Sequence, residues 1–350
     1  MKQERIEKIV RQAIEEHIFP GCVVGYSSEG EQTVLPFGNL TYDSFAPKVE
    51  EETLYDVASI TKSVPTSMLA LFLLERKLIS LHDPVIRFIP EFVNSFREKV
   101  TLFHLLTHTV EFDLQLSLLK DASPREILAT LFTTNLRKKP GTSFSYVNAA
   151  SILLGLVVER VSGKKLDTFA EEIYFAPLGM KQTTFSPVDI SQDLIAPSEI
   201  DAWRGKEIRG VVHDESAYTL RSAMVPGSAG LFSTVPDLLV FLQMILAGGE
   251  WKGKRYLSEN LIRAIETNQI PFLEESTGLG WELSQSWYMG QYITPHTFGK
   301  TGFTGCHVVC DRKKGTILIL LSNSCYPTRP KSKDKINALR RKLSDVVFAD

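Results

Sequence analysis

Hydrophobic positions divide the chain into strand-forming ends and a helical middle. Near the start, apolar side chains share one face of an expected helix, at Ile6, Ile9, Val10, Ala13 and Ile14. Apolar runs at 22–26 and 32–35, separated by a turn at 28–31, predict an antiparallel hairpin. Further strands are expected toward the other end, over residues 280–283, 297–302, 306–310 and 316–321.

The last of these runs is apolar on both faces, which is typical of a central strand. A final helix is expected over residues 331–348. One side of it carries Ile336, Leu339, Leu343 and Val347. Its other side is basic, and we expect that side to be a solvated face.

The middle of the chain has the periodicity of helices. An almost wholly apolar stretch, starting at Ser59 and running to Leu74, predicts one buried helix. Helix starts are indicated at Thr101 and at Ser123, where a serine precedes a proline. Two more helices are expected over 148–161, which is apolar nearly all round, and over 235–246. Residues 186–230 have little periodicity and are expected to form long ordered loops.

Neither the hairpin nor the C-terminal strands make a stable sheet alone, so both chain ends should share one sheet. The predicted fold class is α/β (α+β), an antiparallel sheet flanked by helices with an inserted all-helical domain. Residues 1–60 and 270–350 would form the sheet domain. Residues 61–269 would form the inserted, mostly helical domain with long loops, and an active site would lie in the cleft between the two.

Composition excludes several classes of partner. The chain has 350 residues, with 39 Lys and Arg against 41 Asp and Glu, and its net charge of −2 argues against binding nucleic acid. The longest apolar runs, 68–74 and 152–158, are too short to span a membrane. The charged N-terminus is no signal peptide, so we expect a cytoplasmic protein, or a periplasmic or extracellular one if a leader has been removed.

The cysteines are Cys22, Cys306, Cys310 and Cys325, without the spacing of a metal site and without clustered histidines. No metal site is therefore expected. Cys306 and Cys310 would lie about 13 Å apart on one strand, which is beyond the reach of a disulfide. Buried free thiols are the expected state of all of them.

Ser59 and Lys62 are three residues apart at the start of an apolar stretch, so on a helix the ammonium can reach the hydroxyl. A serine hydroxyl needs a base before it is a good nucleophile. Lysine can act as that base where burial lowers its pKa, and the apolar turns at 68–74 would supply the burial. A capping serine with a solvated lysine has the same spacing, so other motifs must decide.

Two further stretches offer the groups that such a pair needs. Tyr146 and Asn148 lie two residues apart before a buried helix, so a phenol and an amide can face one cleft. The strand at 300–302 offers a cation, a hydroxyl and a glycine, Lys300, Thr301 and Gly302. The missing Cβ of Gly302 would let a substrate backbone approach closely.

In this order the three stretches resemble the Ser-x-x-Lys, Tyr-x-Asn and Lys-Thr-Gly motifs of the serine β-lactamase and penicillin-binding-protein superfamily. The similarity is greatest to its class C-like branch, with related esterases and DD-peptidases. The segments 105–109 and 230–234 also agree with the family, and the resemblance extends from Pro20 to Asn323. It implies a β-lactamase/transpeptidase-like fold.

The resemblance implies that Ser59 attacks an acyl carbonyl while Lys62 and Tyr146 exchange its proton. Which of these two is the general base stays open. The oxyanion hole is implied to use the backbone amides of Ser59 and Phe303. No metal or organic cofactor is implied.

The same resemblance assigns substrate binding to Asn148, Lys300, Thr301 and Gly302. Asn148 would hold the substrate amide, and Thr301 with Lys300 a carboxylate. The expected partner is a small-molecule acyl substrate, which is a peptide, amide, ester or β-lactam. The oligomeric state stays open.

The histidines are assigned less sharply. His213 lies in a Val-His-Asp-x-x-Ala run, which resembles a subgroup of DD-carboxypeptidase-like proteins and muropeptide amidases. It either borders the cleft or pins the long loop. His108 is expected to be a structural, hydrogen-bonded core residue, and structural roles are also expected for His296, Cys306 and His307.

Two departures from the family bear on the substrate. Lys300 stands where that subgroup often has histidine, and Val110-Glu111 replaces the usual Ser-Gly. The resemblance as a whole implies a serine acyl hydrolase that works through an acyl-enzyme on peptidoglycan-derived peptides or amides, with esters as side substrates. The alternatives are a true class C-like β-lactamase and a catalytically silent penicillin-binding or scaffold protein.

Overall fold

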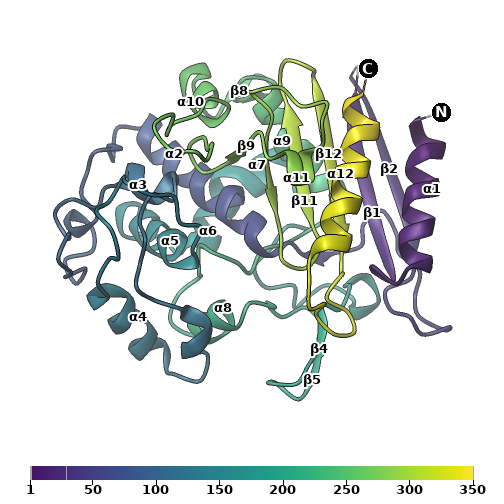
Figure 1. The fold of residues 1–350 in the computed structure, drawn as a ribbon, viewed down its shortest axis with the longest axis horizontal. Coiled ribbons are helices and arrows are strands. Elements are labelled where there is room, and N and C mark those ends of the chain that lie inside the picture. Colours follow the sequence, from purple (N-terminus) through teal and green to yellow (C-terminus); the bar gives the residue numbers. More distant parts are fainter. Residues whose placement is uncertain (1, 29, 350) are drawn as a thin grey trace.

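A computed structural model describes residues 2–28 and 30–349 (Figure 1). Its centre is a six-stranded antiparallel sheet in the order β2-β1-β12-β11-β10-β9. From one edge to the other, the strands are β2 Glu31–Gly38, β1 Gly21–Ser28, β12 Thr316–Ser322, β11 His307–Asp311, β10 Phe298–Thr301 and β9 Glu282–Leu283. Both chain ends supply strands to this one sheet, so the predicted fold class is confirmed.

Strand β12 lies between β1 and β11, and every one of its residues is buried. Its partners are in register at Val24 with Leu320 and at Val308 with Ile319. The apolar character of both faces therefore predicted its central position correctly. Glu29, within the predicted turn of the first hairpin, lies outside the described residues.

Helices cover both faces of the sheet. On one face, α1 (Lys2–Glu15) and α12 (Asp334–Phe348) pack side by side with both termini near the same end, as Figure 1 shows. Their apolar stripes meet β-strand residues in one core cluster, which includes Ile6, Val10, Leu339 and Leu343. On the other face, α9 (Val235–Leu246) packs so closely that a Cβ added at Gly25 would lie 2.2 Å from Val235 Cγ1.

Helix α9 lies within the range that the sequence assigned to the helical insertion, yet it contacts β1, β11 and β12. A single large core cluster joins residues of the sheet to residues of the helical part. The division into 1–60 with 270–350 and 61–269 stays a prediction, and the packing of α9 favours a boundary that leaves this helix with the sheet.

The remaining helices lie mostly on the far side of the sheet from α1 and α12 (Figure 1). They are α2 Met68–Glu75, α3 Leu102–Leu106, α4 Pro124–Thr133, α5 Asn148–Ser162, α6 Leu166–Ala170, α7 Ala176–Leu178, α8 Glu215–Leu220, α10 Glu259–Ile265 and α11 Ser286–Met289. Short turns of other helix types are η1 Ala58–Lys62, η2 Ser63–Ser67, η3 Val85–Arg87, η4 Leu116–Leu119, η5 Glu171–Phe175 and η6 Gln192–Leu194. Helix α5 is buried along most of its length, as its composition predicted.

The predicted continuous helix from Ser59 to Leu74 is wrong. The segment begins as a tight 3₁₀ turn, and Val64 has extended backbone angles of φ −111° and ψ 110°. The cause is Pro65, because the ring of a proline disfavours helical angles in the residue before it. The regular helix α2 begins only at Met68.

Residues 186–230 contain more structure than predicted. A small hairpin, β4 (Glu199–Asp201) with β5 (Lys206–Ile208), and helix α8 lie within this stretch. Outside this stretch there are two more short strand pairs. They are β3 (Tyr55–Asp56) with β6 (Phe232–Ser233), and β7 (Glu250–Trp251) with β8 (Lys254–Arg255). Strands of two or three residues are too short to give a period, so the sequence pattern could not reveal them.

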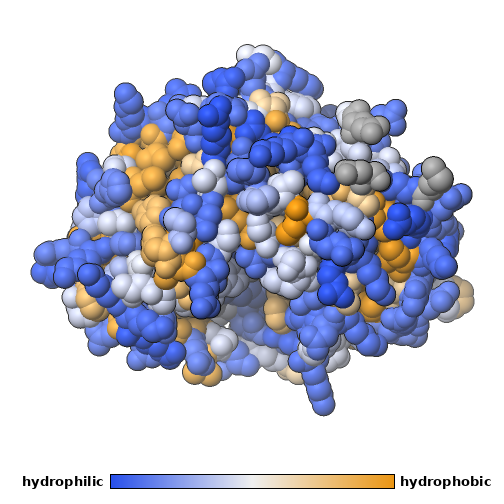
Figure 2. Space-filling model, turned by 45° about the horizontal axis from the view of Figure 1, so that its top comes forward, coloured by the Kyte–Doolittle hydropathy of each residue, from blue (hydrophilic) through white to orange (hydrophobic). Residues whose placement is uncertain are grey.

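The four cysteines are buried and free, as predicted. Among the helices of residues 2–28 and 30–349, none has the length and apolar character needed to cross a membrane. The face of the molecule in Figure 2 is mostly hydrophilic, and its hydrophobic residues form separate patches.

Candidate active site

A pocket of about 180 Å³ opens where the end of β10 meets the first turn of η1. It is lined by Ser59, Tyr146, Trp287, Thr301, Gly302, Phe303, Lys333, Asn337 and Arg340. A larger cavity of about 420 Å³, with a mostly apolar wall between residues 167 and 230, contains none of the predicted site residues. The small pocket is therefore the candidate active site.

Ser59 and Lys62 lie on the 3₁₀ turn η1. Lys62 Nζ donates hydrogen bonds to Ser59 Oγ at 2.9 Å and to the carbonyl of Ser228 at 2.8 Å. A 3₁₀ helix has three residues per turn, which places residues i and i+3 directly above one another. The break at Val64 follows this pair in sequence, so it leaves the contact intact.

Lys62 is only 1% exposed. Burial lowers the pKa of Lys62, and the cation of Lys300 acts in the same direction, while Tyr146 opposes both. Lys62 therefore loses its proton at a lower pH than an ordinary lysine does. The Ser228 carbonyl fixes the amine beside the serine hydroxyl whichever form it has.

Tyr146 lies between two cations. The centre of its ring is 4.0 Å from Lys300 Nζ and 5.3 Å from Lys62 Nζ. The Tyr146 side chain is 41% exposed. Desolvation of its hydroxyl would raise the pKa of Tyr146, but the cations of Lys300 and Lys62, together with a hydrogen bond to the Ser59 side chain, outweigh it and lower this pKa. The phenolate of Tyr146 therefore forms at a lower pH than that of an ordinary tyrosine.

His108 packs against the same phenol, with ring centroids 4.9 Å apart. Burial, with Lys300 and Lys62 nearby, lowers the pKa of His108 well below its usual range, so the imidazole is neutral. Its buried Nδ1 has no hydrogen-bond partner in the described part of the chain. The hydrogen bond expected of a core histidine is therefore not made at Nδ1.

Glu282 on the edge strand β9 pairs with Lys300, Oε1 to Nζ at 2.7 Å. Burial would lower the pKa of Lys300, but the carboxylate of Glu282 and the phenol of Tyr146 outweigh it and raise this pKa. Lys300 therefore stays protonated. Its charge is already partly neutralised within the protein before any substrate binds.

We expect Glu282→Gln to lower the free energy of unfolding by about 3 kcal/mol, because it leaves a buried ammonium without its carboxylate. Since the pKa of Lys300 is raised in the folded protein, this stabilisation is present below the ordinary lysine pKa and is lost as pH rises through the folded value. Urea unfolding at neutral pH and at a pH above that range measures both effects.

The control is Glu7→Gln, since Glu7 pairs with Arg11 at the same 2.7 Å but with both side chains more than 40% exposed. That change should cost about 0.5 kcal/mol. Equal losses in the two variants would contradict the importance of the buried pair.

Of the other predicted residues, Thr301, Gly302 and Phe303 line the same pocket, whereas Asn148 and Lys300 are not among its lining residues. Asn148 donates its amide hydrogen to Asp214 Oδ2 at 3.0 Å, so one of its hydrogens is already engaged. A Cβ added at Gly302 would lie 2.4 Å from the carbonyl oxygen of Val57. The close approach predicted at Gly302 is thus made by the protein's own backbone.

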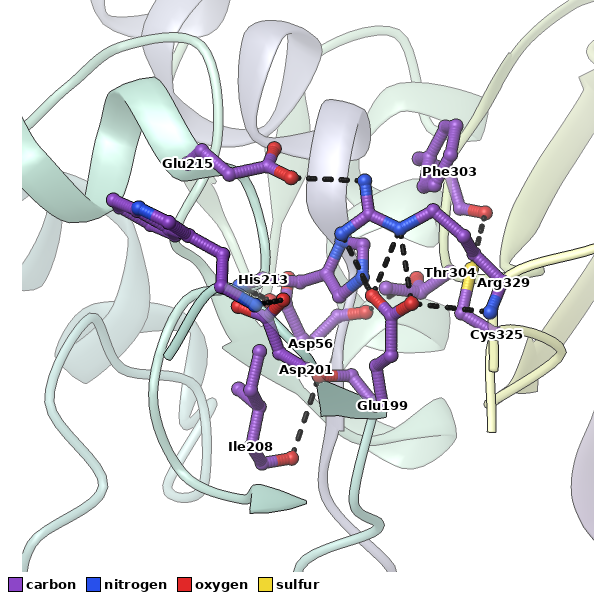
Figure 3. A network of polar contacts seen from close by, with 12 residues as sticks. Asp56, Glu199, Asp201, Ile208, His213, Glu215, Phe303, Thr304, Cys325 and Arg329 are labelled. Carbon is purple, nitrogen blue, oxygen red and sulfur yellow. Dashed lines mark hydrogen bonds and ion pairs between the residues drawn. The ribbon is translucent and has the colours of Figure 1, made fainter. Parts of the chain in front are cut away.

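His213 is buried and its Nε2 lies 2.7 Å from Glu199 Oε2. Its ring stacks on Phe303, which lines the pocket, with centroids 5.6 Å apart. Figure 3 shows this histidine inside a network of polar contacts. These contacts tie down the long loop, which favours the loop-pinning alternative.

The basic side of the last helix is not simply a solvated face. Arg340 is 3% exposed and donates to the carbonyls of Gly302 and Cys306 at 2.8 Å. Lys333 Nζ donates to the carbonyl of Phe303 at 2.8 Å. Both side chains line the pocket, and a helix period alone cannot distinguish a basic face in water from one against a cleft.

Known proteins resemble this chain over most of its length. The family model described as Beta-lactamase matches residues 6–341. A protein of Escherichia coli (strain K12), provisionally named as a D-alanyl-D-alanine carboxypeptidase, is 29% identical over 308 residues, which cover 79% of this chain and 70% of that protein.

Two solved structures are similar throughout. A penicillin-binding protein homologue from Caulobacter crescentus has a TM-score of 0.79 at 18% identity, covering 99% of this chain and 97% of that chain. EstCE1, described as a hydrolase with promiscuous acyltransferase activity, has a TM-score of 0.77 at 20% identity, covering 99% of this chain and 98% of that chain. At such identities the likeness establishes the fold alone.

Proposed function

Because the chain belongs to the beta-lactamase family and is a serine acyl hydrolase, we propose that it cleaves peptide or amide bonds in peptidoglycan-derived substrates. Simple esters would be side substrates. The observation that carries the proposal is the contact of Lys62 Nζ with Ser59 Oγ, beside a phenol whose pKa is lowered. A nucleophile, a cation and a base within one pocket are what acyl transfer requires.

We assign the role of nucleophile to Ser59 and that of general base to Tyr146. A protonated Lys62 donates to both Ser59 Oγ and the Ser228 carbonyl and has no lone pair to offer, whereas the phenolate can accept the serine proton. Ser59 Oγ then bonds to the acyl carbon as its proton passes to Tyr146. The carbonyl oxygen becomes an oxyanion held by the backbone amides of Ser59 and Phe303.

The tetrahedral intermediate then collapses. The bond to the leaving nitrogen breaks, the nitrogen takes the proton from Tyr146, and the acyl group stays on Ser59. In the second half-reaction, water bonds to the acyl carbon as its proton passes to Tyr146. The bond between the acyl carbon and Ser59 Oγ then breaks, and Ser59 takes the proton from Tyr146, which releases the acid and restores the enzyme. Lys62 stays positioned beside the oxygen of Ser59 throughout and stabilises the phenolate.

A substrate with a free carboxylate suits the charges around the pocket. Lys300 is already paired with Glu282, but Lys333 and Arg340 line the pocket and have no carboxylate partner among the described residues. Together with the hydroxyl of Thr301 they would attract a C-terminal carboxylate. The D-alanyl-D-alanine carboxypeptidase name of the Escherichia coli relative is consistent with such a peptide.

A true β-lactamase is the second candidate, because the matched family bears that name and a β-lactam presents an amide and a carboxylate to the same groups. The two candidates differ in deacylation rate. A catalytically silent scaffold would not need a lysine buried against a serine hydroxyl.

The test is to incubate the protein with a D-alanyl-D-alanine peptide, a muramoyl-L-alanine amide, p-nitrophenyl acetate and nitrocefin. We expect an acyl mass increase on the peptide that contains Ser59, and a larger kcat/KM for the peptide or the amide than for nitrocefin. Fast nitrocefin turnover with slow peptide cleavage would instead support the β-lactamase. No covalent adduct with any of them, nor with a fluorophosphonate, would support the scaffold.

A further inference from the structure

Asp56 lies where the two segments that carry the proposed oxyanion-hole amides meet. Its Oδ1 accepts a hydrogen bond from the amide of Ala58, the residue before Ser59, at 2.8 Å. Its backbone carbonyl accepts one from Thr304 Oγ1, next to Phe303, at 2.7 Å. One buried residue thus holds the neighbours of both amides.

His213 joins the same two segments by a second route. Its backbone amide donates to Asp56 Oδ2 at 2.7 Å, and its ring stacks on Phe303 with an interplanar angle of 23°. The ring is fixed by Glu199, 2.7 Å from Nε2, as Figure 3 shows. A shift of His213 would therefore displace Asp56 and Phe303 together.

Arg329 and Lys333 complete the support of Phe303. Arg329 pairs with Glu199 at 2.7 Å and with Glu215 at 2.8 Å, and its guanidinium lies 5.9 Å from the centre of the Phe303 ring (Figure 3). Lys333 Nζ lies 3.7 Å from the same ring centre and donates to the Phe303 carbonyl. The ring and the carbonyl of Phe303 are both held by these contacts. Its backbone amide donates to no acceptor among the described residues and is available to a substrate.

The contacts of Asp56 require a carboxylate. Both of its oxygens accept backbone N–H bonds, one from Ala58 and one from His213. An asparagine has one acceptor oxygen and an NH₂ group, so it would turn a donor toward one of these two amides. Replacing the buried carboxylate of Asp56 by the amide of asparagine would therefore remove one of its two hydrogen bonds to backbone amides.

We propose that Asp56 and His213 are positioning residues that fix the amide of Ser59 relative to the amide of Phe303. The inference rests on the proposed function, because it presupposes that these amides bind the substrate oxygen. Oxyanion-hole donors act on the transition state far more than on the bound substrate. Loss of their alignment should therefore lower kcat and leave KM almost unchanged.

The first test is Asp56→Asn, assayed on the substrate that the wild type turns over fastest. We expect kcat to fall by roughly 10²-fold, the size of the loss of one oxyanion-hole donor. In the trapped acyl-enzyme, the infrared band of the acyl carbonyl should move to higher wavenumber, because a carbonyl with weaker hydrogen bonds is less polarised. A merely structural role would not move this band.

The matched control is Asp237→Asn. Asp237 is similarly buried, at 7% exposure, and its Oδ2 accepts hydrogen bonds from the amide of Gln182 and the hydroxyl of Thr183 at 2.9 and 2.8 Å. It lies in the first turn of α9, outside the pocket. This variant should lose stability and keep the kcat and the carbonyl band of the wild type.

Thr304→Val covers the case in which Asp56→Asn does not fold. It removes only the hydroxyl that donates to the Asp56 carbonyl, with little change in shape, and should lower kcat by roughly 10-fold with the same shift of the band. Thr304→Ser keeps the hydroxyl and should restore both values.

Two different failures are distinguishable. If the wild type forms no adduct at Ser59, the proposed function is wrong and the positioning roles are wrong with it. If the wild type acylates normally, but Asp56→Asn and Thr304→Val keep its kcat and its carbonyl band, the function stands and the positioning inference is overturned.

Discussion

Replacing Ser59 by alanine is expected to abolish covalent labelling and to lower hydrolysis by about 10⁴-fold or more, as happens when a nucleophile that acts as part of a unit is removed. The fold should persist, because Ser59 lines the open pocket and Lys62 keeps its hydrogen bond to the Ser228 carbonyl when the serine hydroxyl is removed. The change in the free energy of unfolding should stay within about 1 kcal/mol. Intact-mass measurement after a fluorophosphonate or a fluorescent penicillin, with a thermal melt, measures both.

Ser143→Ala is a suitable control for this experiment. Ser143 lies on the loop that leads to Tyr146, and its hydroxyl donates to Glu111 Oε2 at 3.0 Å instead of lining the pocket. It should be labelled like the wild type. Persistent labelling of the Ser59→Ala variant at wild-type rate would show that another residue is the nucleophile.

Much of the architecture could be predicted from the sequence because burial leaves a recognisable pattern of apolar residues along each strand and helix. Strand β12 lies at the centre of the sheet because it is apolar on both faces, and α5 is buried because it is apolar nearly all round. The three motifs also predicted residues that lie near one another, and each motif supplies at least one residue to the lining of the pocket, namely Ser59, Tyr146, Thr301 and Gly302. Each motif is a local pattern, and the fold only had to bring the three together.

The break after Ser63 could have been found by the same reasoning, since Pro65 follows within the predicted helix and restrains Val64. The ion pair of Lys300 with Glu282 could not have been found from the sequence. It depends on a two-residue edge strand that pairs Glu282 with Gly299, the neighbour of Lys300 in β10. Such a pairing leaves no periodic trace in the sequence.

The supports of Phe303 could not be predicted for a similar reason. Glu199 and Arg329 are 130 residues apart and meet only because the β4–β5 hairpin lies against the segment after β12. Pattern analysis assigns such charged residues to solvent by default. Three-dimensional neighbours of a site are thus least visible where they come from short or irregular segments.

Lys62→Met is expected to lower kcat/KM by roughly 10³-fold, within the range of general acid–base contributions. Methionine fills the buried space without a charge, so the fold should survive the loss of the bond to the Ser228 carbonyl, which costs about 1–3 kcal/mol. Because Lys62 helps to lower the pKa of Tyr146, its removal raises that pKa. The residual activity should therefore rise with pH over a higher range than in the wild type.

The pH profile decides which residue is the base. If Tyr146 accepts the proton, the acidic limb of kcat/KM moves to higher pH in Lys62→Met, and Tyr146→Phe loses the limb altogether because a phenyl ring cannot titrate. If Lys62 is the base, Lys62→Met has no such limb, while Tyr146→Phe keeps one that reports the lysine. Since Tyr146 opposes the lowering of the lysine pKa, that limb would lie at lower pH than in the wild type. Activity of both variants within about 10-fold of wild type would leave neither residue as the base, given the size of such contributions.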